Sequence, residues 1–323
     1  MTASPASKFA TVAEGRPSGG PYKICYELHG QGPNKVLLVM GLSGSLRAWD
    51  TTVQQLLARG GYEVCIFDNR GIGHSDAPGP GYSVKDMAQD AFELLQHLGW
   101  TRNVFVAGVS MGGMITQELV LLAPEGTFAA IVLISTHAGR TIPPLATIVT
   151  FAGVLFGPQK SEAEAFDTYC NLVFALPWLD QEAPGYKSNR EMMHAHLKAT
   201  MAEKGMQSKQ GRDGQMAAIR GHYVSAAKLK KIGQLGVPVL VMTGTEDALI
   251  RPKNSHHIAK CIGCPIEVFE RAGHGLAQER PHRFHELLTG TFAKSRAFVT
   301  VPHPAGEDAA VASADVPISA SSL

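Results

Sequence analysis

The chain contains 323 residues, 45% of them hydrophobic and 18% charged, which is enough apolar material for one large α/β domain or two small ones. Its formal net charge of +1 excludes the strongly basic or acidic balance typical of proteins that bind nucleic acids or acidic polymers. The five cysteines are scattered, which argues against a disulfide framework, and no apolar run has the roughly 18 residues of a membrane span. We therefore expect a soluble, cytoplasmic protein without a nucleic-acid partner.

Residues 1–20, rich in small residues and proline, predict a flexible lead-in with at most one short strand near residues 9–14. Beyond them, apolar runs bounded by glycine-rich turns predict strands at 22–28, 35–40, 62–67, 104–107, 130–135, 237–242 and 266–270. Amphipathic stretches between these runs predict helices at 47–58, 83–98, 111–122, 253–260 and 281–294. Such alternation predicts an α/β fold, a mostly parallel central sheet with helices on both faces, whose functional loops lie at the carboxyl ends of the strands.

The alternation stops between residues 140 and 232, where helix formers are frequent and no convincing strand occurs. This pattern predicts a helical segment inserted into a core made of residues 21–139 and 233–295. Residues 296–323, rich in alanine, serine, proline and acid, predict a disordered tail.

Residues 108–112 read Gly-Val-Ser-Met-Gly and fit the G-x-S-x-G pattern between a buried strand and a helix. A serine on so sharp a turn has strained backbone angles, and glycines two residues before and after it remove side chains that would collide. The following helix directs its free N–H groups toward the serine. The pattern therefore predicts that Ser110 is a nucleophile, the alternative being a glycine-rich turn without chemistry.

A serine nucleophile needs a base, which in turn needs a carboxylate to orient it. His274 lies in Ala-Gly-His-Gly after the last predicted strand, where flanking glycines leave its imidazole free to reach over the sheet. Asp247 follows the preceding strand in Gly-Thr-Glu-Asp, so Asp247 is the expected acid, although the adjacent Glu246 could serve instead. The alternative for His274 is an ordinary surface histidine.

The oxyanion hole is expected to combine the backbone N–H groups of Met111 and Leu42, because preset backbone donors stabilise a tetrahedral intermediate without reorganisation. No cofactor and no metal are expected. Gly71 and Gly73 lack the third glycine of a dinucleotide-binding loop, and the Cys261–Cys264 pair lacks a second pair of ligands.

Together these residues resemble the α/β-hydrolase family over roughly residues 20–295. The stretch Asp68-Asn69-Arg70-Gly71 is similar to the family's turn after its fourth strand, which implies structural roles for Asp68 and Arg70. Residues 39–45 look like its oxyanion loop, with Met40 where a histidine is common. The resemblance also implies that residues 140–232 form a cap inserted after the sixth strand.

The resemblance implies a serine hydrolase that cleaves a carboxylic ester through an acyl-enzyme intermediate. Thioesterases, carbon–carbon bond hydrolases and cofactor-free perhydrolases share the triad, and a ligand receptor with little turnover can share the fold, so these alternatives stay open. The mostly apolar stretch Ile142–Phe156 favours a substrate with an apolar acyl or alkyl part.

Charge is unevenly distributed in the inserted segment, with five acids and no Lys or Arg in residues 161–186, then ten bases against three acids in residues 187–231. Either the two halves neutralise each other, or bases beside Ile142–Phe156 make a weak contact with an anionic lipid surface. The sequence ends in Ser-Ser-Leu, which differs from the peroxisomal Ser-Lys-Leu signal at its middle position, so the cytoplasm remains the expected location.

Overall fold

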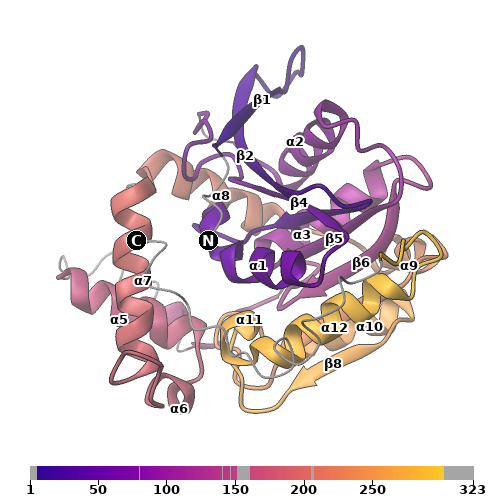
Figure 1. Cartoon of the computed structure of the whole chain (residues 1–323). Helices are drawn as coiled ribbons and strands as arrows, with labels where there is room; N and C mark the ends of the chain where they lie inside the picture. The colour runs from indigo at the N-terminus through magenta and orange to yellow at the C-terminus, as the bar shows by residue number, and fades with distance from the viewer. Residues whose placement is uncertain are drawn as a thin grey trace.

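The computed structural model describes residues 6–79, 81–139, 141–145, 147–150, 161–204 and 207–301. Its centre is a sheet of eight strands in the order β1-β2-β4-β3-β5-β6-β7-β8 (Figure 1). The strands are β1 Lys8–Val12, β2 Tyr22–Gly30, β3 Asn34–Val39, β4 Tyr62–Phe67, β5 Val104–Val109, β6 Phe128–Ile134, β7 Val239–Gly244 and β8 Ile266–Phe269. β2 pairs antiparallel with both of its neighbours, β1 and β4. The pairs from β4 through β3 to β8 are all parallel, as the alternation predicts.

Helices connect the parallel strands. Those of the core are η1 Leu46–Trp49, α1 Asp50–Ala58, α2 Val84–His97, α3 Met111–Leu122, α10 Pro252–Ile262, α11 Leu276–Glu279 and α12 Pro281–Ala293. The segment between β6 and β7 contributes α5 Glu162–Val173, α6 Leu176–Leu179, α7 Asn189–Lys204, α8 Lys209–Gly221 and α9 Ala226–Gly233. Capping boxes begin two of them, at Ser83 with Asp86 and at Ser161 with Glu164.

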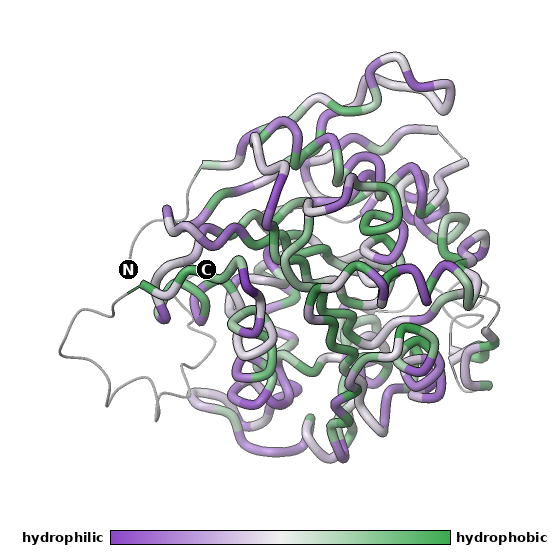
Figure 2. The backbone as a smooth tube through the Cα atoms, turned by 90° about the vertical axis from the view of Figure 1, so that its right-hand side faces the viewer, coloured by the Kyte–Doolittle hydropathy of each residue, from purple (hydrophilic) through white to green (hydrophobic). Residues whose placement is uncertain are grey.

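The two faces of the sheet bury separate apolar clusters, because successive strand residues point to opposite sides. Leu37 and Val39 pack in the cluster covered by α2, α3, α9 and α10. Val36 and Leu38 pack in the other cluster, under α1 and α12. Figure 2 shows the hydrophobic stretches gathered in the middle of the molecule. The predicted α/β architecture is therefore confirmed.

Both ends of the chain pack on the core where the structure describes them, and β1 lies at the short strand expected near residues 9–14. β1 pairs along β2 with Ala10 and Val12 buried, and Arg16 forms an ion pair of 2.9 Å with Asp90. Near the other end, the Val299 N–H donates to Asn34 Oδ1 at 2.9 Å. Residues 8–16 and 297–299 thus pack on the core through contacts distant in sequence, whereas residues 1–5 and 302–323 lie outside the described residues.

The described part of the inserted segment contains helices that pack in two different places. α5, α6 and α7 share a cluster around Cys170, Trp178 and Met193, and Figure 1 shows them gathered on one side of the sheet. α9 lies far from them and buries Leu229 and Ile232 in the core cluster. α9, which lies before the expected boundary at residue 232, thus covers the sheet face beside α3 and α10.

Opposite charges of the inserted segment meet between its helices. Arg190 on α7 lies 3.1 Å from Asp167 on α5 and 3.8 Å from Asp180, and His194 also approaches Asp167 at 3.1 Å. These contacts join α7 to acidic residues of the first half of the segment. Among the described residues, no helix combines the length and the apolar character that crossing a bilayer requires.

Candidate active site

Ser110 lies between β5 and α3 in a strained backbone conformation, with φ 58° and ψ −122°. A non-glycine residue adopts such a φ only where its surroundings enforce it. Here the Ser110 N–H donates to Ile134 O at 2.9 Å, and the Thr136 hydroxyl donates to Ser110 O at 2.7 Å. The neighbouring strand β6 and its following residues thus hold the serine at the carboxyl edge of the sheet.

The two glycines of the motif are required by close packing. A Cβ on Gly108 would lie 2.3 Å from Thr116 Oγ1, and one on Gly112 would lie 2.1 Å from Val39 O. Real Cβ atoms do not approach other atoms so closely. The steric reason expected for the pattern is therefore confirmed, since each glycine lets α3 approach the sheet.

Asp247 and His274 are in contact, as expected. His274 Nδ1 lies 2.8 Å from Asp247 Oδ2, and the aspartate side chain has no exposed surface. Asp247 Oδ1 also accepts the N–H groups of Leu249 at 2.9 Å and Ile250 at 2.8 Å, which fix the carboxylate. Glu246 is exposed to solvent, whereas Asp247 is the carboxylate in contact with the imidazole.

The loop proposed for the oxyanion hole lies against the serine. A Cβ on Gly41 would be 3.0 Å from Ser110 Cβ and 3.6 Å from its Oγ. Leu42 follows directly in this loop, and Met111 begins α3 immediately after the serine. The structure thus places the Gly41 loop and the start of α3 next to Ser110.

The comparisons with known proteins agree with this fold. A family model described as alpha/beta hydrolase fold matches residues 34–281, well over half of the chain. The chain belongs to the α/β-hydrolase family.

Relatives of this α/β hydrolase carry different activities in their names. A putative carbamate hydrolase RutD from Azorhizobium caulinodans is 26% identical over 279 residues, which cover 84% of this chain and 96% of that protein. A non-heme haloperoxidase from Rhodococcus erythropolis is also 26% identical, over 83% of this chain and 93% of its own length. The crystal structure of an enol-lactonase from Burkholderia xenovorans LB400 superposes with a TM-score of 0.69 at 19% identity, covering 89% of this chain and all of that one. This structural likeness establishes the fold alone.

Two glutamines on the inserted segment were not anticipated from the sequence. Gln215 on α8 is fully buried, and its Oε1 accepts the N–H of Ser43, next to Leu42, at 3.0 Å. Its Nε2 donates to Arg70 O at 2.9 Å, and Gln207 donates to Gln215 Oε1 at 3.1 Å. No local pattern marks these residues, because their partners outside the inserted segment lie more than 130 positions away in the sequence.

The turn after β4 contacts the loops at the carboxyl edge of the sheet. Its Asp68 and Arg70 have the structural roles that the resemblance implied. Arg70 donates to Asp90 Oδ1 at 2.7 Å, and both side chains are buried. Asp68 accepts the N–H of Leu46 at 2.8 Å, and Asn69 donates to Met40 O at 2.8 Å. These residues connect the loops around the serine and have structural roles.

A third unanticipated residue is Glu279, whose carboxylate is buried behind the His274 loop. Burial raises its pKa to about 7, although hydrogen bonds from the N–H groups of Gly273 and Ala175 act in the opposite direction. Ionisation of this carboxyl group is therefore sensitive to conditions near neutral pH.

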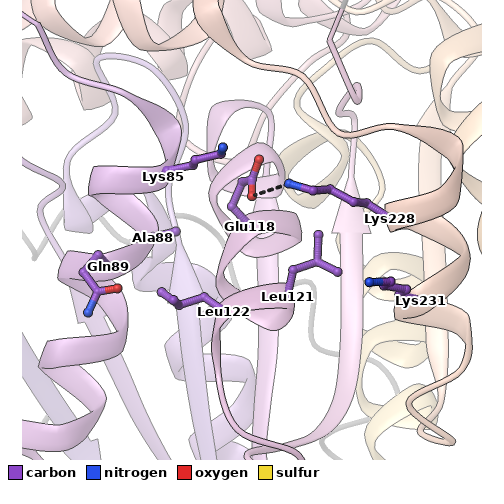
Figure 3. A pocket seen from close by; sticks show the side chains of 8 residues that line it. All are labelled: Lys85, Ala88, Gln89, Glu118, Leu121, Leu122, Lys228 and Lys231. Carbon is purple, nitrogen blue, oxygen red and sulfur yellow. Dashed lines mark ion pairs between the residues drawn. The ribbon is translucent and has the colours of Figure 1, made fainter.

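A separate pocket of about 300 Å³, which Ser110 does not line, opens between α2, α3 and α9. Figure 3 shows the side chains around it. Its walls combine apolar residues such as Leu121 with three lysines, of which Lys228 lies 3.9 Å from Glu118. Among the described residues, no group of three or more His, Cys, Asp or Glu side chains is arranged to hold a metal ion. Cys261 instead lies 3.7 Å from His257 Nε2 on its own helix.

Proposed function

We propose that this α/β hydrolase cleaves carboxylic esters through an acyl-enzyme intermediate. Ser110 Oγ attacks the ester carbonyl while His274 takes its proton, and the Leu42 and Met111 N–H groups stabilise the oxyanion. The leaving alcohol then receives that proton from His274. A water molecule, deprotonated by the same imidazole, attacks the acyl group and releases the acid and free Ser110.

The observation that carries this proposal is the pair formed by Asp247 and His274. The 2.8 Å contact presents Nδ1 to the carboxylate, which leaves Nε2 as the atom that exchanges protons with the serine. The strained turn at Ser110 and the adjacent Gly41 loop supply the other two parts of an acyl-transfer site.

A second candidate substrate is a carbamate, which the same groups would attack at its carbonyl. The RutD relative, named a putative carbamate hydrolase, covers 84% of this chain. The haloperoxidase relative keeps perhydrolysis, in which hydrogen peroxide replaces water, among the activities to test.

Turnover of p-nitrophenyl acetate, butyrate and octanoate tests the ester proposal, with the matched N-methylcarbamate and a thioester as separate arms. A fluorophosphonate probe should label wild type, and Ser110→Ala should neither label nor turn over. Carbamate cleavage without ester cleavage would select the second candidate. Tight binding of esters without turnover would instead identify a receptor.

We also propose an apolar acyl or alkyl group in the substrate and a weak contact with anionic membranes. The described part of the Ile142–Phe156 stretch exposes Ile142, Leu145 and Val149, at 71%, 73% and 63% of their surface, and Arg251 donates to Pro143 O beside it. Residues 151–160 lie outside the described residues. Co-sedimentation with anionic vesicles should exceed that with neutral ones and weaken with salt, whereas equal sedimentation would refute the contact.

We propose a cytoplasmic location because the five cysteines are scattered along the sequence, a pattern unlike the disulfide framework of a secreted protein. A fluorescent fusion that leaves the C-terminus exposed should be diffuse. A punctate peroxisomal signal would contradict this location.

A further inference from the structure

The loop that carries His274 lies directly against the carboxyl end of α5 in the inserted segment. The N–H groups of His274 and Gly275 both donate to Val173 O, at 2.7 and 3.0 Å. Val173 is the last residue of α5, so its carbonyl has no partner within the helix and is available for this contact. One carbonyl of the inserted segment therefore accepts hydrogen bonds from two consecutive residues of the base loop.

The glycines around His274 make this approach possible. A Cβ on Gly273 would lie 2.8 Å from Ala175 N, and one on Gly275 would lie 2.3 Å from Cε1 of Phe174. The sequence suggested that these glycines free the imidazole. The structure adds that they admit residues 173–175 to within van der Waals contact of the loop.

Glu279 also connects the His274 loop with the residues that follow α5. Its Oε1 accepts the Gly273 N–H at 2.9 Å, and its Oε2 accepts the Ala175 N–H at 3.3 Å. The residue is 4% exposed, and the guanidinium of the adjacent Arg280 donates to backbone carbonyls, including Glu279 O. Among the described contacts, two backbone N–H groups rather than an ion pair therefore hold this buried carboxylate.

A buried carboxylate is costly unless its hydrogen bonds are made, and here both bonds exist only while the two segments are together. Separation of residue 175 from the loop would leave Oε2 without this donor and Val173 O without both of its donors. Glu279 therefore favours one arrangement in which the base loop and the end of α5 are docked.

We propose that Glu279 is a positioning residue, which locks the end of α5 onto the His274 loop and thereby sets the position of the base. It acts through Gly273 and touches neither substrate nor Ser110 in this role. The effect on turnover rests on the proposed function of His274. The docking itself does not, and it can be measured separately.

The test compares Glu279→Gln and Glu279→Ala with wild type. Glutamine keeps the length of the side chain but can accept only one of the two N–H groups with its carbonyl oxygen, and alanine accepts neither. Glu267→Gln is the matched control, since Glu267 is a partly exposed carboxylate 2.9 Å from Arg283.

Hydrogen exchange of the full chain measures the docking without any substrate. Peptides that contain residues 173–175 and 273–275 should exchange faster in Glu279→Gln and faster still in Glu279→Ala, while the control matches wild type. Unchanged exchange in both variants, with melting temperatures close to wild type, would overturn the docking role.

Ester kinetics measure the consequence for the base. kcat should fall roughly 10-fold in Glu279→Gln and roughly 100-fold in Glu279→Ala, with KM within about 3-fold of wild type, because the lost interaction acts on the chemical step. Faster exchange with unchanged kcat would overturn the positioning role. If wild type cleaves no ester, the proposed function fails, and the exchange measurement still decides whether Glu279 docks α5.

Discussion

The turn at Ser110 and the loop at His274 follow strands of the same sheet, but different parts of the molecule hold them. Ser110 is fixed by the core itself, through Ile134, Thr136 and the approach of α3 to Val39. Val39 lies on β3, Ile134 lies on β6 and Thr136 lies just after β6. β3 and β6 are the two neighbours of β5 in the sheet.

The His274 loop depends on a segment about one hundred residues away in the sequence. Val173 accepts two of its N–H groups, and Glu279 connects Gly273 with Ala175. The position of Ser110 is thus a property of the core, whereas the position of His274 also depends on where the inserted segment docks. Variants that change the contacts of the Ser110 turn but not those of the His274 loop, or the reverse, can test this difference.

The largest effect is expected for the nucleophile. Ser110→Ala should lower kcat by about 10⁴- to 10⁶-fold, because the members of a triad act as a unit. Its melting temperature should stay near that of wild type, since the core contacts that shape the turn are retained. Activity within about tenfold of wild type would rule out Ser110 as the nucleophile.

The acid should have the next largest effect. Asp247→Asn should lower kcat by roughly 10⁴-fold, because an amide favours the wrong tautomer of His274. Glu246→Gln is the matched control and should be nearly silent, since Glu246 is exposed. The reverse outcome in steady-state kinetics would transfer the role of the acid to Glu246.

A smaller effect is expected for the support of the oxyanion loop. Gln215→Ala removes the acceptor of the Ser43 N–H and should lower kcat roughly 10-fold, less than the ~10²- to 10³-fold loss for an oxyanion donor itself. Gln210→Ala, on the same helix but exposed, should match wild type. Equal kinetics of the two variants would show that the loop keeps its position without Gln215.

The smallest effect concerns stability and pH. Burial raises the pKa of Glu279 to about 7 from about 4.5, so this group stabilises the folded state most at low pH. That contribution to the free energy of unfolding is lost as the pH rises from about 4.5 to about 7. Urea midpoints measured from about pH 5 to 8 should therefore fall more steeply for wild type than for Glu279→Gln.

The comparison between variants isolates this group, because other titrating residues are common to both proteins. Glu267→Gln should show the slope of wild type, since Glu267 is partly exposed and in a surface ion pair. Parallel slopes for wild type and Glu279→Gln would mean that Glu279 is already ionised throughout this range.

The sequence alone determined the strands, the serine turn and the loops that carry Asp247 and His274. Each depends on neighbours in the chain: a buried strand shows as a short apolar run, and a strained turn shows as glycines around a serine. Because parallel strands end at one edge of the sheet, the order of these motifs was enough to predict that their loops lie at the same edge.

Only the tertiary structure decided which distant residues hold those loops. Gln215, Val173 and Glu279 bind backbone groups, and an N–H or carbonyl leaves no trace in the residue type that carries it. The structure also placed α9 in the core, because its apolar face fits the sheet beside α3. Local patterns report what a segment can bury, whereas the partner it packs against is settled only when all segments compete for the same surface.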